Sequence, residues 1–229
     1  MLSQEEIKKQ AGVYAADFVK QGTTIGLGTG STVYWLIDEL GQRVKEGLEI
    51  VIVPTSAQTA QLAKQANITV SSLDRIERLF LTIDGADEID PKGQLIKGGG
   101  GALLQEKIVA SVSDELIIIA DNSKLVHQLG KFPLPVEVIT FGYKQVRQKI
   151  VDTGFCKEVK LREKNGEYFI TDHRHYILDC YCEKIADAFL LNDILHLIPG
   201  VVETGLFIDM ATKAIIAYED GKIEEIAFR

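Results

Sequence analysis

The chain is poor in cysteine, in positive charge and in long hydrophobic runs, and each shortage excludes a class of protein. Its three cysteines, an odd number among 229 residues, predict no disulfide framework. A net charge of −8 argues against a basic surface, so we expect no binding to nucleic acid or to anionic membranes. No apolar run is long enough to span a bilayer, and residues 1–12 lack a secretory signal pattern. We therefore expect a cytoplasmic protein.

The composition that remains is that of an ordinary globular protein, with 46% hydrophobic and 25% charged residues. A helix is expected from a capping box at Ser3 and Glu6, ending near Gly22. Apolar strands then alternate with helices, a pattern typical of a parallel sheet covered on both faces. The expected strands are 23–28, 48–54, 68–70, 79–84 and 115–121, and the expected helices are 31–47, 55–67 and 102–112.

The pattern changes near Phe132, where prolines interrupt the chain. A strand, a helix, two strands around an Asn-Gly turn, another strand and a helix follow, which indicates a small α+β subdomain. The end of the chain returns to apolar strands with an Asp-Gly hairpin. We predict an α/β fold in which 1–131 and 205–229 form the core and 132–204 the subdomain.

The first chemically informative segment is "GLGTGST", residues 26–32, between an expected strand and helix. It is neither a dinucleotide fingerprint, because Ser31 stands where the sixth position needs glycine, nor a nucleotide-hydrolase phosphate loop. Its glycines nevertheless let backbone N–H groups approach an anion, with hydroxyl donors from Ser31 and Thr32. A strand–helix turn with a Ser/Thr cap is the alternative, and the segment alone does not decide.

A second segment, "DGADEIDPKGQLIKGGGG", carries clustered carboxylates, a lysine and four glycines, and precedes an expected helix. Ligands of open α/β sheets bind outside the carboxyl ends of the strands. We expect Asp84, Asp87 and the glycine loop after Lys97 to lie at that edge, together with residues 26–32. A single aspartate after a strand is more often a turn former, but the combination favours a site.

Three further ionisable residues are candidates. Glu106 has apolar neighbours at i−4, i−3, i+3 and i+4, which favours a raised carboxylate pKa and suits a general base. Pairing with a nearby lysine is its alternative explanation. Lys124 ends another buried strand, and Lys8 lies in the first helix. Each lysine taken alone is equally compatible with an ordinary surface position.

A possible metal site needs separate weighing. His173, His175, Cys180 and Cys182 are all zinc-ligand residue types. Their spacing matches none of the usual structural zinc patterns, and both histidines fall in an expected turn. We therefore predict that no metal is bound there.

The order and spacing of these segments resemble the ribose-5-phosphate isomerase family, type A. The resemblance rests on "GLGTGST", "VPTSAQT", "DGADEID", "IKGGGGALLQEKIVA", "DNSK" and "IPGVVETGLFI" and runs along essentially the whole chain. Only "TDHRHYILDCYC" departs from it, because the family more often has a small Asn/Gly-containing turn there. It implies a Rossmann-like core without dinucleotide, a ferredoxin-like subdomain, a homodimer or homotetramer, and catalysis without metal or cofactor.

The resemblance also implies roles in a reaction that interconverts ribose 5-phosphate and ribulose 5-phosphate through an enediolate. Glu106 matches the proton-transferring base, and Asp84, Asp87 and Lys97 match the polar cluster, where either aspartate is a candidate to open the sugar ring. Lys8 matches a phosphate-contacting lysine less securely. The implied substrate-binding set is Lys8, Thr29, Gly30, Ser31, Thr32, Asp84, Gly85, Ala86, Asp87, Lys97, Gly98, Gly99, Gly100 and Lys124.

Three other functions are alternatives to this one. A different sugar-phosphate isomerase or deaminase on a similar fold would need a substrate panel to separate it. A sugar-phosphate sensor should carry a DNA-binding helix pair and a basic face, and this acidic chain shows neither. A CoA-transferase would need its covalent glutamate on a nucleophile loop, not within an apolar helix such as that of Glu106.

Overall fold

The computed structural model describes residues 1–228, and the chain divides into two compact units. Unit 1 consists of Met1–Ala86, Gln105–Lys124 and the chain from Met210, and unit 2 consists of Asp87–Leu104 and Leu125–Asp209. The division expected from the sequence differs in three segments, 87–104, 125–131 and 205–209, which are in unit 2. The reason is strand pairing within that unit, described below.

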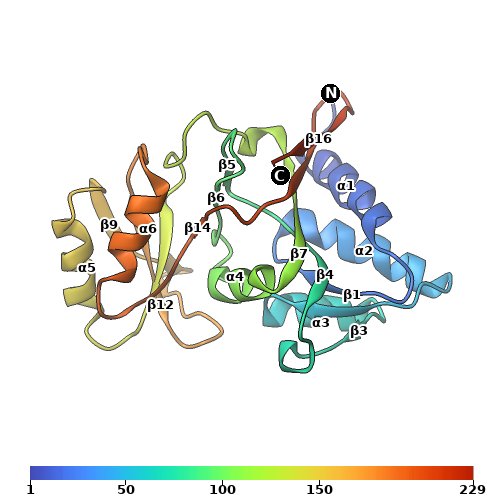
Figure 1. Cartoon of the computed structure of the whole chain (residues 1–229), viewed down its shortest axis with the longest axis horizontal. Helices are drawn as coiled ribbons and strands as arrows, with labels where there is room; N and C mark the ends of the chain where they lie inside the picture. The colour runs from blue at the N-terminus through green and yellow to red at the C-terminus, as the bar shows by residue number, and fades with distance from the viewer. Residues whose placement is uncertain (229) are drawn as a thin grey trace. The chain divides into compact units, whose positions relative to one another are not determined.

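Unit 1 is built on one seven-stranded sheet. Its strands are β1 (Thr24–Leu27), β2 (Val51–Pro54), β3 (Thr69–Val70), β4 (Leu79–Asp84), β7 (Ser113–Asp121), β15 (Lys213–Ala217) and β16 (Ile223–Ala227). They lie in the order β16-β15-β7-β4-β1-β2-β3 (Figure 1). Every neighbouring pair is parallel except β15–β16, the hairpin that the Asp-Gly turn predicts.

Two α-helices of unit 1 begin at side chains that cap them. Ser3 and Glu6 form the predicted capping box, and the Ser56 hydroxyl accepts a hydrogen bond from Thr59 N at the start of the third helix. The helices are α1 (Gln4–Ala15), α2 (Ser31–Lys45), α3 (Ala57–Gln65) and α4 (Leu103–Ser111, whose first two residues belong to unit 2), with 3-10 turns η1 (Ala16–Phe18), η2 (Leu73–Arg75) and η3 (Asn122–Lys124).

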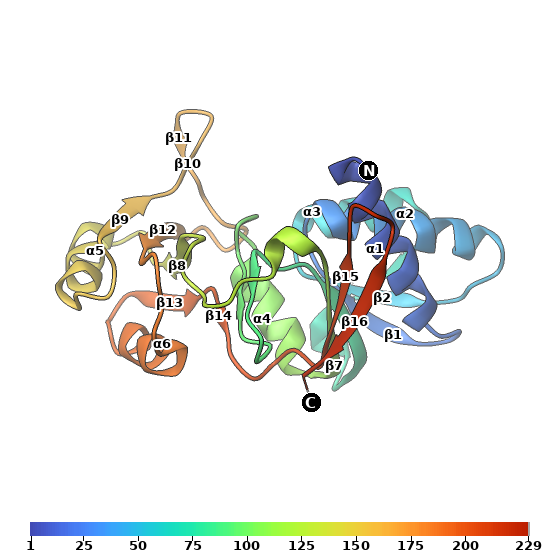
Figure 2. The same cartoon turned by 90° about the horizontal axis from the view of Figure 1, so that it is seen from above.

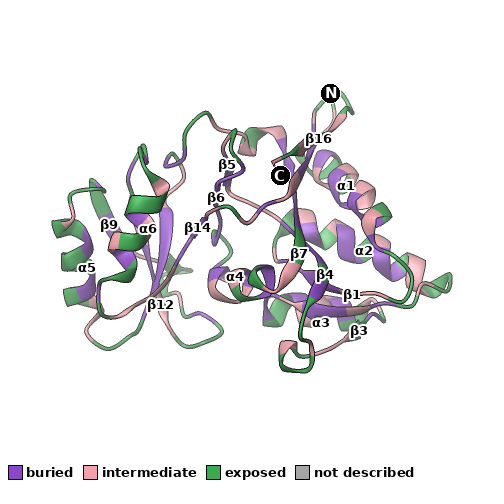
Figure 3. Ribbon diagram, in the orientation of Figure 1, coloured by how far each residue is buried: buried purple, intermediate pink, exposed green. Residues whose placement is uncertain are grey.

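The sheet of unit 1 is covered by helices on both faces. Alternate residues of each strand point to opposite faces, so neighbouring residues contact different helices. Ile25 and Leu27 of β1 belong to the main core, with residues of α1 and α2. A Cβ built on Gly26, between them, would meet Val109 of α4 at 2.6 Å, so α4 covers the other face. Figure 3 shows buried strands between helices whose outward faces are exposed.

Unit 2 contains three antiparallel sheets. The small ones are β5 (Glu88–Ile89), β6 (Leu95–Ile96) and β14 (Leu206–Phe207) in the order β14-β6-β5, and the pair β10 (Glu163–Lys164) and β11 (Glu167–Tyr168). The main elements are β8 (Leu134–Val138), α5 (Tyr143–Asp152), β9 (Glu158–Leu161), β12 (Tyr176–Tyr181), α6 (Ala188–His196) and β13 (Val201–Thr204).

The main sheet of unit 2 has the order β13-β8-β12-β9, and all its neighbours are antiparallel (Figure 2). The chain order is β8-α5-β9-β12-α6-β13, the ferredoxin-like succession. Val146 and Ile150 of α5 share one core with Leu191 and Leu195 of α6. The predicted fold class, a mostly parallel α/β core with a smaller α+β part, is confirmed.

Two details correct the sequence-based expectations. First, β5 and β6 lie within "EIDPKGQLI", where no strand was expected; they pair with each other and with β14, which brings residues 87–104 into unit 2. Second, Cys156 and Cys182 form a disulfide, although the odd cysteine count predicted none. The two cysteines come together because Lys157 N donates to Tyr181 O beside them.

Within residues 1–228, none of the helices is long and apolar enough to cross a membrane.

Candidate active site

In unit 1, Gly28 and Asp84 fit against each other at the carboxyl ends of the neighbouring parallel strands β1 and β4. A Cβ on Gly28 would lie 2.0 Å from Asp84 Oδ1, so only glycine leaves room for the carboxylate. Asp84 is 1% exposed, and its Oδ1 accepts hydrogen bonds from Thr29 N (3.1 Å) and Gly85 N (2.7 Å). The carboxylate therefore shapes the loop before α2, at the sheet edge where the sequence predicts it.

The Thr29 side chain anchors the same loop to the start of α3. Its hydroxyl lies 2.8 Å from the hydroxyls of Thr55 and Ser56 and 3.1 Å from that of Thr59. Thr59 donates in turn to Gly28 O at 2.8 Å. Gly30 follows with a φ of 137°, a backbone conformation suited to glycine, and α2 begins at Ser31 without a side-chain cap.

This arrangement leaves the loop with the properties of an anion site. The first N–H groups of α2 have no partner within the helix, and they carry the positive end of its dipole. Ser31, at the first position of the helix, is exposed. The expected alternative, a Ser or Thr side chain capping α2, does not occur, because Gly30 is the cap.

Glu106 lies in the first turn of α4 and is 3% exposed. The predicted apolar helix face is present, since Val109 and Ala110, three and four residues later, are also buried. Val109 packs with Val53 and Leu79 of the sheet, which fixes the rotation of the helix. A carboxylate held in this way has the surroundings that suit a proton-transferring group.

Two lysines of the predicted set also belong to unit 1. Lys124 is half-buried in η3, directly after the carboxyl end of β7, which is the neighbour of β4. Lys8 lies in α1, where its Nζ is 2.9 Å from Glu5 Oε1. Lys8 is thus paired with an exposed carboxylate, whereas Lys124 stands at the sheet edge that carries Asp84.

The remaining predicted residues belong to unit 2. Asp87 precedes β5, its backbone N donates to Ile96 O, and its Oδ2 accepts from Gly99 N at 2.7 Å. A Cβ on Gly99 would lie 2.5 Å from Asp87 Oδ1, which explains the glycine there. Lys97 is 2% exposed, and its Nζ lies 5.2 Å from the centre of the Phe207 ring.

The glycine loop after Lys97 does not follow a strand of the parallel sheet, as expected from the sequence. It follows β6, in the antiparallel sheet of unit 2, so the expectation of two strand-end loops in one sheet was wrong. Two contacts that the sequence did not suggest hold this loop. Arg162 Nη1 donates to Gly98 O (2.7 Å) and Gly99 O (3.2 Å), and the Phe169 ring packs against Gly101.

The His/Cys group does not assemble. Cys182 is bonded to Cys156, and His175 Nδ1 lies 2.9 Å from the buried Glu137 carboxylate. Burial raises the pKa of the Cys180 thiol, which keeps it protonated at neutral pH. Among residues 1–228, no group of three or more His, Cys, Asp and Glu side chains is arranged to hold a metal ion.

Unit 1 provides a buried glutamate, an aspartate and a loop suited to an anion. Unit 2 provides an aspartate, a buried lysine and the backbone amides of the glycine loop. Carboxylates for moving protons, a cation for a developing oxyanion and N–H groups for a phosphate are the requirements of sugar-phosphate isomerisation. Thr55, Ser56, Thr59 and Arg162 were not identified as site residues from the sequence. "VPTSAQT" was the only signal for the first three, and no local pattern marks Arg162.

Comparisons with known proteins agree with this chemistry. A model of the ribose 5-phosphate isomerase A (phosphoriboisomerase A) family matches residues 51–221. A relative from Bacillus mycoides (strain KBAB4), named ribose-5-phosphate isomerase A, is 58% identical over 216 residues, which cover 94% of this chain and 97% of the relative.

Solved structures give the same result over both units. Ribose 5-phosphate isomerase from Plasmodium falciparum matches with a TM-score of 0.94 and 39% identity, covering 97% of this chain and 98% of its own. A D-ribose-5-phosphate isomerase in complex with phospho-erythronic acid matches with a TM-score of 0.94 and 37% identity, covering 99% and 100%. The chain therefore belongs to the ribose 5-phosphate isomerase A family.

Proposed function

We propose that the chain interconverts D-ribose 5-phosphate and D-ribulose 5-phosphate, with Glu106 as the proton-transferring base. The reaction is supported by the family and by relatives named for it. A structural relative bound to phospho-erythronic acid, a phosphorylated sugar acid, supports a sugar phosphate as the ligand. The observation that carries the role of Glu106 is its burial in α4, at 3% exposure, on an apolar helix face.

The steps of the isomerisation require a base and hydrogen-bond donors. The aldose must lose the proton on C2 and the ketose carries one more on C1, so a single carboxylate that reaches both carbons suffices. Negative charge develops on the carbonyl oxygen as the enediolate forms, and donors already in position stabilise it without reorganising. We assign the proton transfer to Glu106 and the oxyanion donors to Lys97 and the N–H groups of Gly98 and Gly100, because Gly99 N already donates to Asp87 Oδ2.

The phosphate and the sugar ring need further groups. We assign the phosphate to residues 29–32 and Lys124, with Lys8 as a further candidate, because N–H groups at a helix start and lysines both favour an anion. We assign ring opening to Asp87. It is partly exposed, whereas Asp84 is buried and holds two backbone N–H groups of its own unit.

The proposal needs no metal ion, since Lys97 and backbone amides supply the positive charge that a cation supplies in metal-dependent isomerases. We further propose, from the family resemblance, that the enzyme is cytoplasmic and forms a homodimer or homotetramer. Gel filtration with light scattering tests the assembly, and cell fractionation tests the location.

The role of Glu106 is tested with Glu106→Gln, which keeps the shape of the side chain but cannot accept a proton. Purified protein is given ribose 5-phosphate, and ribulose 5-phosphate formation is followed together with exchange of the C2 hydrogen with solvent. We expect kcat to fall by about 10²–10⁴-fold, the usual contribution of a general base, and exchange to fall in parallel.

The matched control is Glu115→Gln. Glu115 is an exposed glutamate on β7, which should tolerate the change with kcat intact. If Glu106→Gln keeps more than about a tenth of the wild-type kcat, above the range expected for losing a general base, another residue is the base, and Asp84 and Asp87 become the candidates.

A further inference from the structure

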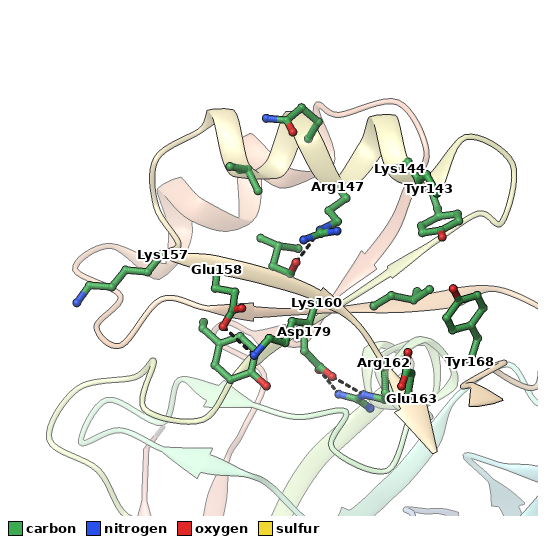
Figure 4. A pocket seen from close by; sticks show the side chains of 15 residues that line it. Tyr143, Lys144, Arg147, Lys157, Glu158, Lys160, Arg162, Glu163, Tyr168 and Asp179 are labelled. Atoms are coloured by element: carbon green, nitrogen blue, oxygen red, sulfur yellow. Dashed lines mark hydrogen bonds and ion pairs between the residues drawn. The ribbon is translucent and has the colours of Figure 1, made fainter. Parts of the chain in front are cut away.

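Arg162 makes an unusual set of contacts for a residue outside the predicted site. It follows β9, and its guanidinium binds both the Asp179 carboxylate and the glycine loop after Lys97. Nε donates to Asp179 Oδ2 at 2.9 Å and Nη2 donates to Asp179 Oδ1, while Nη1 donates to the carbonyls of Gly98 and Gly99. Figure 4 shows the two bonds between Arg162 and Asp179, which both line a hollow together with residues of α5, β9 and β12.

The loop that Arg162 holds would otherwise be free to change conformation. Glycine reaches both signs of φ at little cost, and the loop uses this freedom at Gly98 (φ 97°) and Gly101 (φ 86°). In a run of four glycines, a peptide plane can turn over with little steric resistance. Something outside the loop must therefore select one orientation for each plane.

A hydrogen bond to the carbonyl of one residue also fixes the direction of the N–H group of the next residue. The peptide bond is planar and trans, so the C=O of one residue and the N–H of the next point in opposite directions. A bond to Gly98 O therefore directs Gly99 N–H away from Arg162, and this N–H donates to Asp87 Oδ2 at 2.7 Å. By the same geometry, a bond to Gly99 O directs Gly100 N–H away from Arg162.

We propose that Arg162 is a positioning residue of the isomerase. It sets the orientation of the Gly99 amide, which holds Asp87, and of the Gly100 amide, which is offered to the substrate oxyanion. The inference rests on the proposed function, in which the loop after Lys97 provides those donors.

Burial and hydrogen bonds restrict the movement of the Arg162 guanidinium. Its side chain is 12% exposed and that of Asp179 is 16% exposed, so the pair is largely shielded from water. Both planar groups are engaged side by side, a geometry that lysine cannot reproduce. Asp179 is itself fixed in the sheet, since β12 pairs with both β8 and β9. Phe169 N donates to Arg162 O at 2.9 Å, and the Phe169 ring closes over Gly101.

The test compares two arginines that line the same hollow. Arg147 Nε donates to Val159 O at 2.7 Å, so Arg147 also binds a backbone carbonyl, but not one of the glycine loop. We expect Arg162→Met to lower kcat for ribose 5-phosphate by at least about tenfold, less than the ~10²–10³-fold loss seen when an oxyanion donor is removed outright. KM should change by less than about threefold, because donors that act in the transition state appear in kcat. Arg147→Met should keep the wild-type kcat.

Two further measurements separate positioning from a general loss of structure. Guanidinium ion at millimolar concentration should restore part of the kcat of Arg162→Ala, whereas a merely destabilised protein would gain no activity from it. Arg162→Lys keeps a positive charge beside Asp179 but loses the planar guanidinium group, so it should fold and still show the kcat defect. If Arg162→Met does not fold, Arg162→Lys is the variant that tests the positioning role.

The inference is overturned if folded Arg162→Lys has wild-type kcat, or if Arg147→Met shows the same loss as Arg162→Met. Lys97→Met distinguishes the two proposals. If it retains activity, the assignment of Lys97 to the oxyanion fails; if it is inactive while the Arg162 variants are normal, only the positioning role fails.

Discussion

Gly28, after the end of β1, offers a direct test of how unit 1 holds Asp84. An alanine Cβ at this position would lie 2.0 Å from Asp84 Oδ1, 2.2 Å from its Cγ and 2.6 Å from its Cα. Turning the aspartate side chain cannot relieve the last of these contacts, because the Cα belongs to the backbone of β4. We therefore expect Gly28→Ala to move the strand ends apart and to displace the carboxylate.

The cost follows from the bonds that would be broken. Asp84 Oδ1 accepts from two backbone N–H groups, and hydrogen bonds to a charged group contribute about 1.5–3 kcal/mol each. Loss of both predicts a decrease of roughly 3 kcal/mol or more in the free energy of unfolding. For a chain of this size, that lowers Tm by about 6–12 °C. A displacement near 1 Å in the site should also lower kcat/KM by about 10²-fold.

Thermal and guanidinium unfolding followed by circular dichroism would measure the first effect, and ribose 5-phosphate turnover the second. Gly85→Ala is the matched control for stability. The nearest atom to its Cβ would be Ile119 O at 3.9 Å, and its φ is not in the left-handed region, so unfolding should change by under about 1 kcal/mol. A Gly28→Ala protein as stable as wild type would show that Asp84 is not held by close packing, and the reasoning would be wrong.

Three other outcomes are expected. Lys124→Ala should raise KM for ribose 5-phosphate with kcat nearly unchanged, because a phosphate contact is equally strong in ground and transition states; a fall in kcat alone would place Lys124 in the chemistry. Turnover should survive exhaustive chelation, and activity lost to a chelator and restored by one divalent ion would contradict a metal-free mechanism. The hydrogen bond and charge of Lys213, with the Tyr14 hydroxyl, lower the pKa of Glu225, so the stability that Glu225 contributes is present at neutral pH and lost as pH falls through the lowered pKa. Glu225→Gln should therefore cost up to about 1 kcal/mol at pH 7 and less near pH 3, as measured by urea unfolding; an equal cost at both pH values would refute the linkage.

Local sequence was sufficient for most elements of unit 1. β7 carries the continuous apolar run Leu116–Ala120 because both faces of a parallel sheet are buried, and two helices begin at side chains that cap them, Ser3 and Ser56. The candidate residues Asp84 and Glu106 were identified because carboxylates are conspicuous after an apolar strand and within an apolar helix.

Short and non-local features were beyond the reach of local patterns. β5 and β6 have two residues each, too few for any periodicity to appear, and they form because β14, more than a hundred residues later, pairs with β6. The Cys156–Cys182 disulfide likewise depends on the contact between two segments 26 residues apart.

The sequence by itself determined the fold class and the kinds of group available for catalysis, because hydrophobic periodicity and residue chemistry are properties of short segments. Only the tertiary structure decided what holds those groups in place. The glycine run "KGGGG" specifies a loop that can take many conformations. Which one it takes depends on Asp87 and on Arg162, more than sixty residues later along the chain, because a backbone without side chains has no preference strong enough to choose for itself.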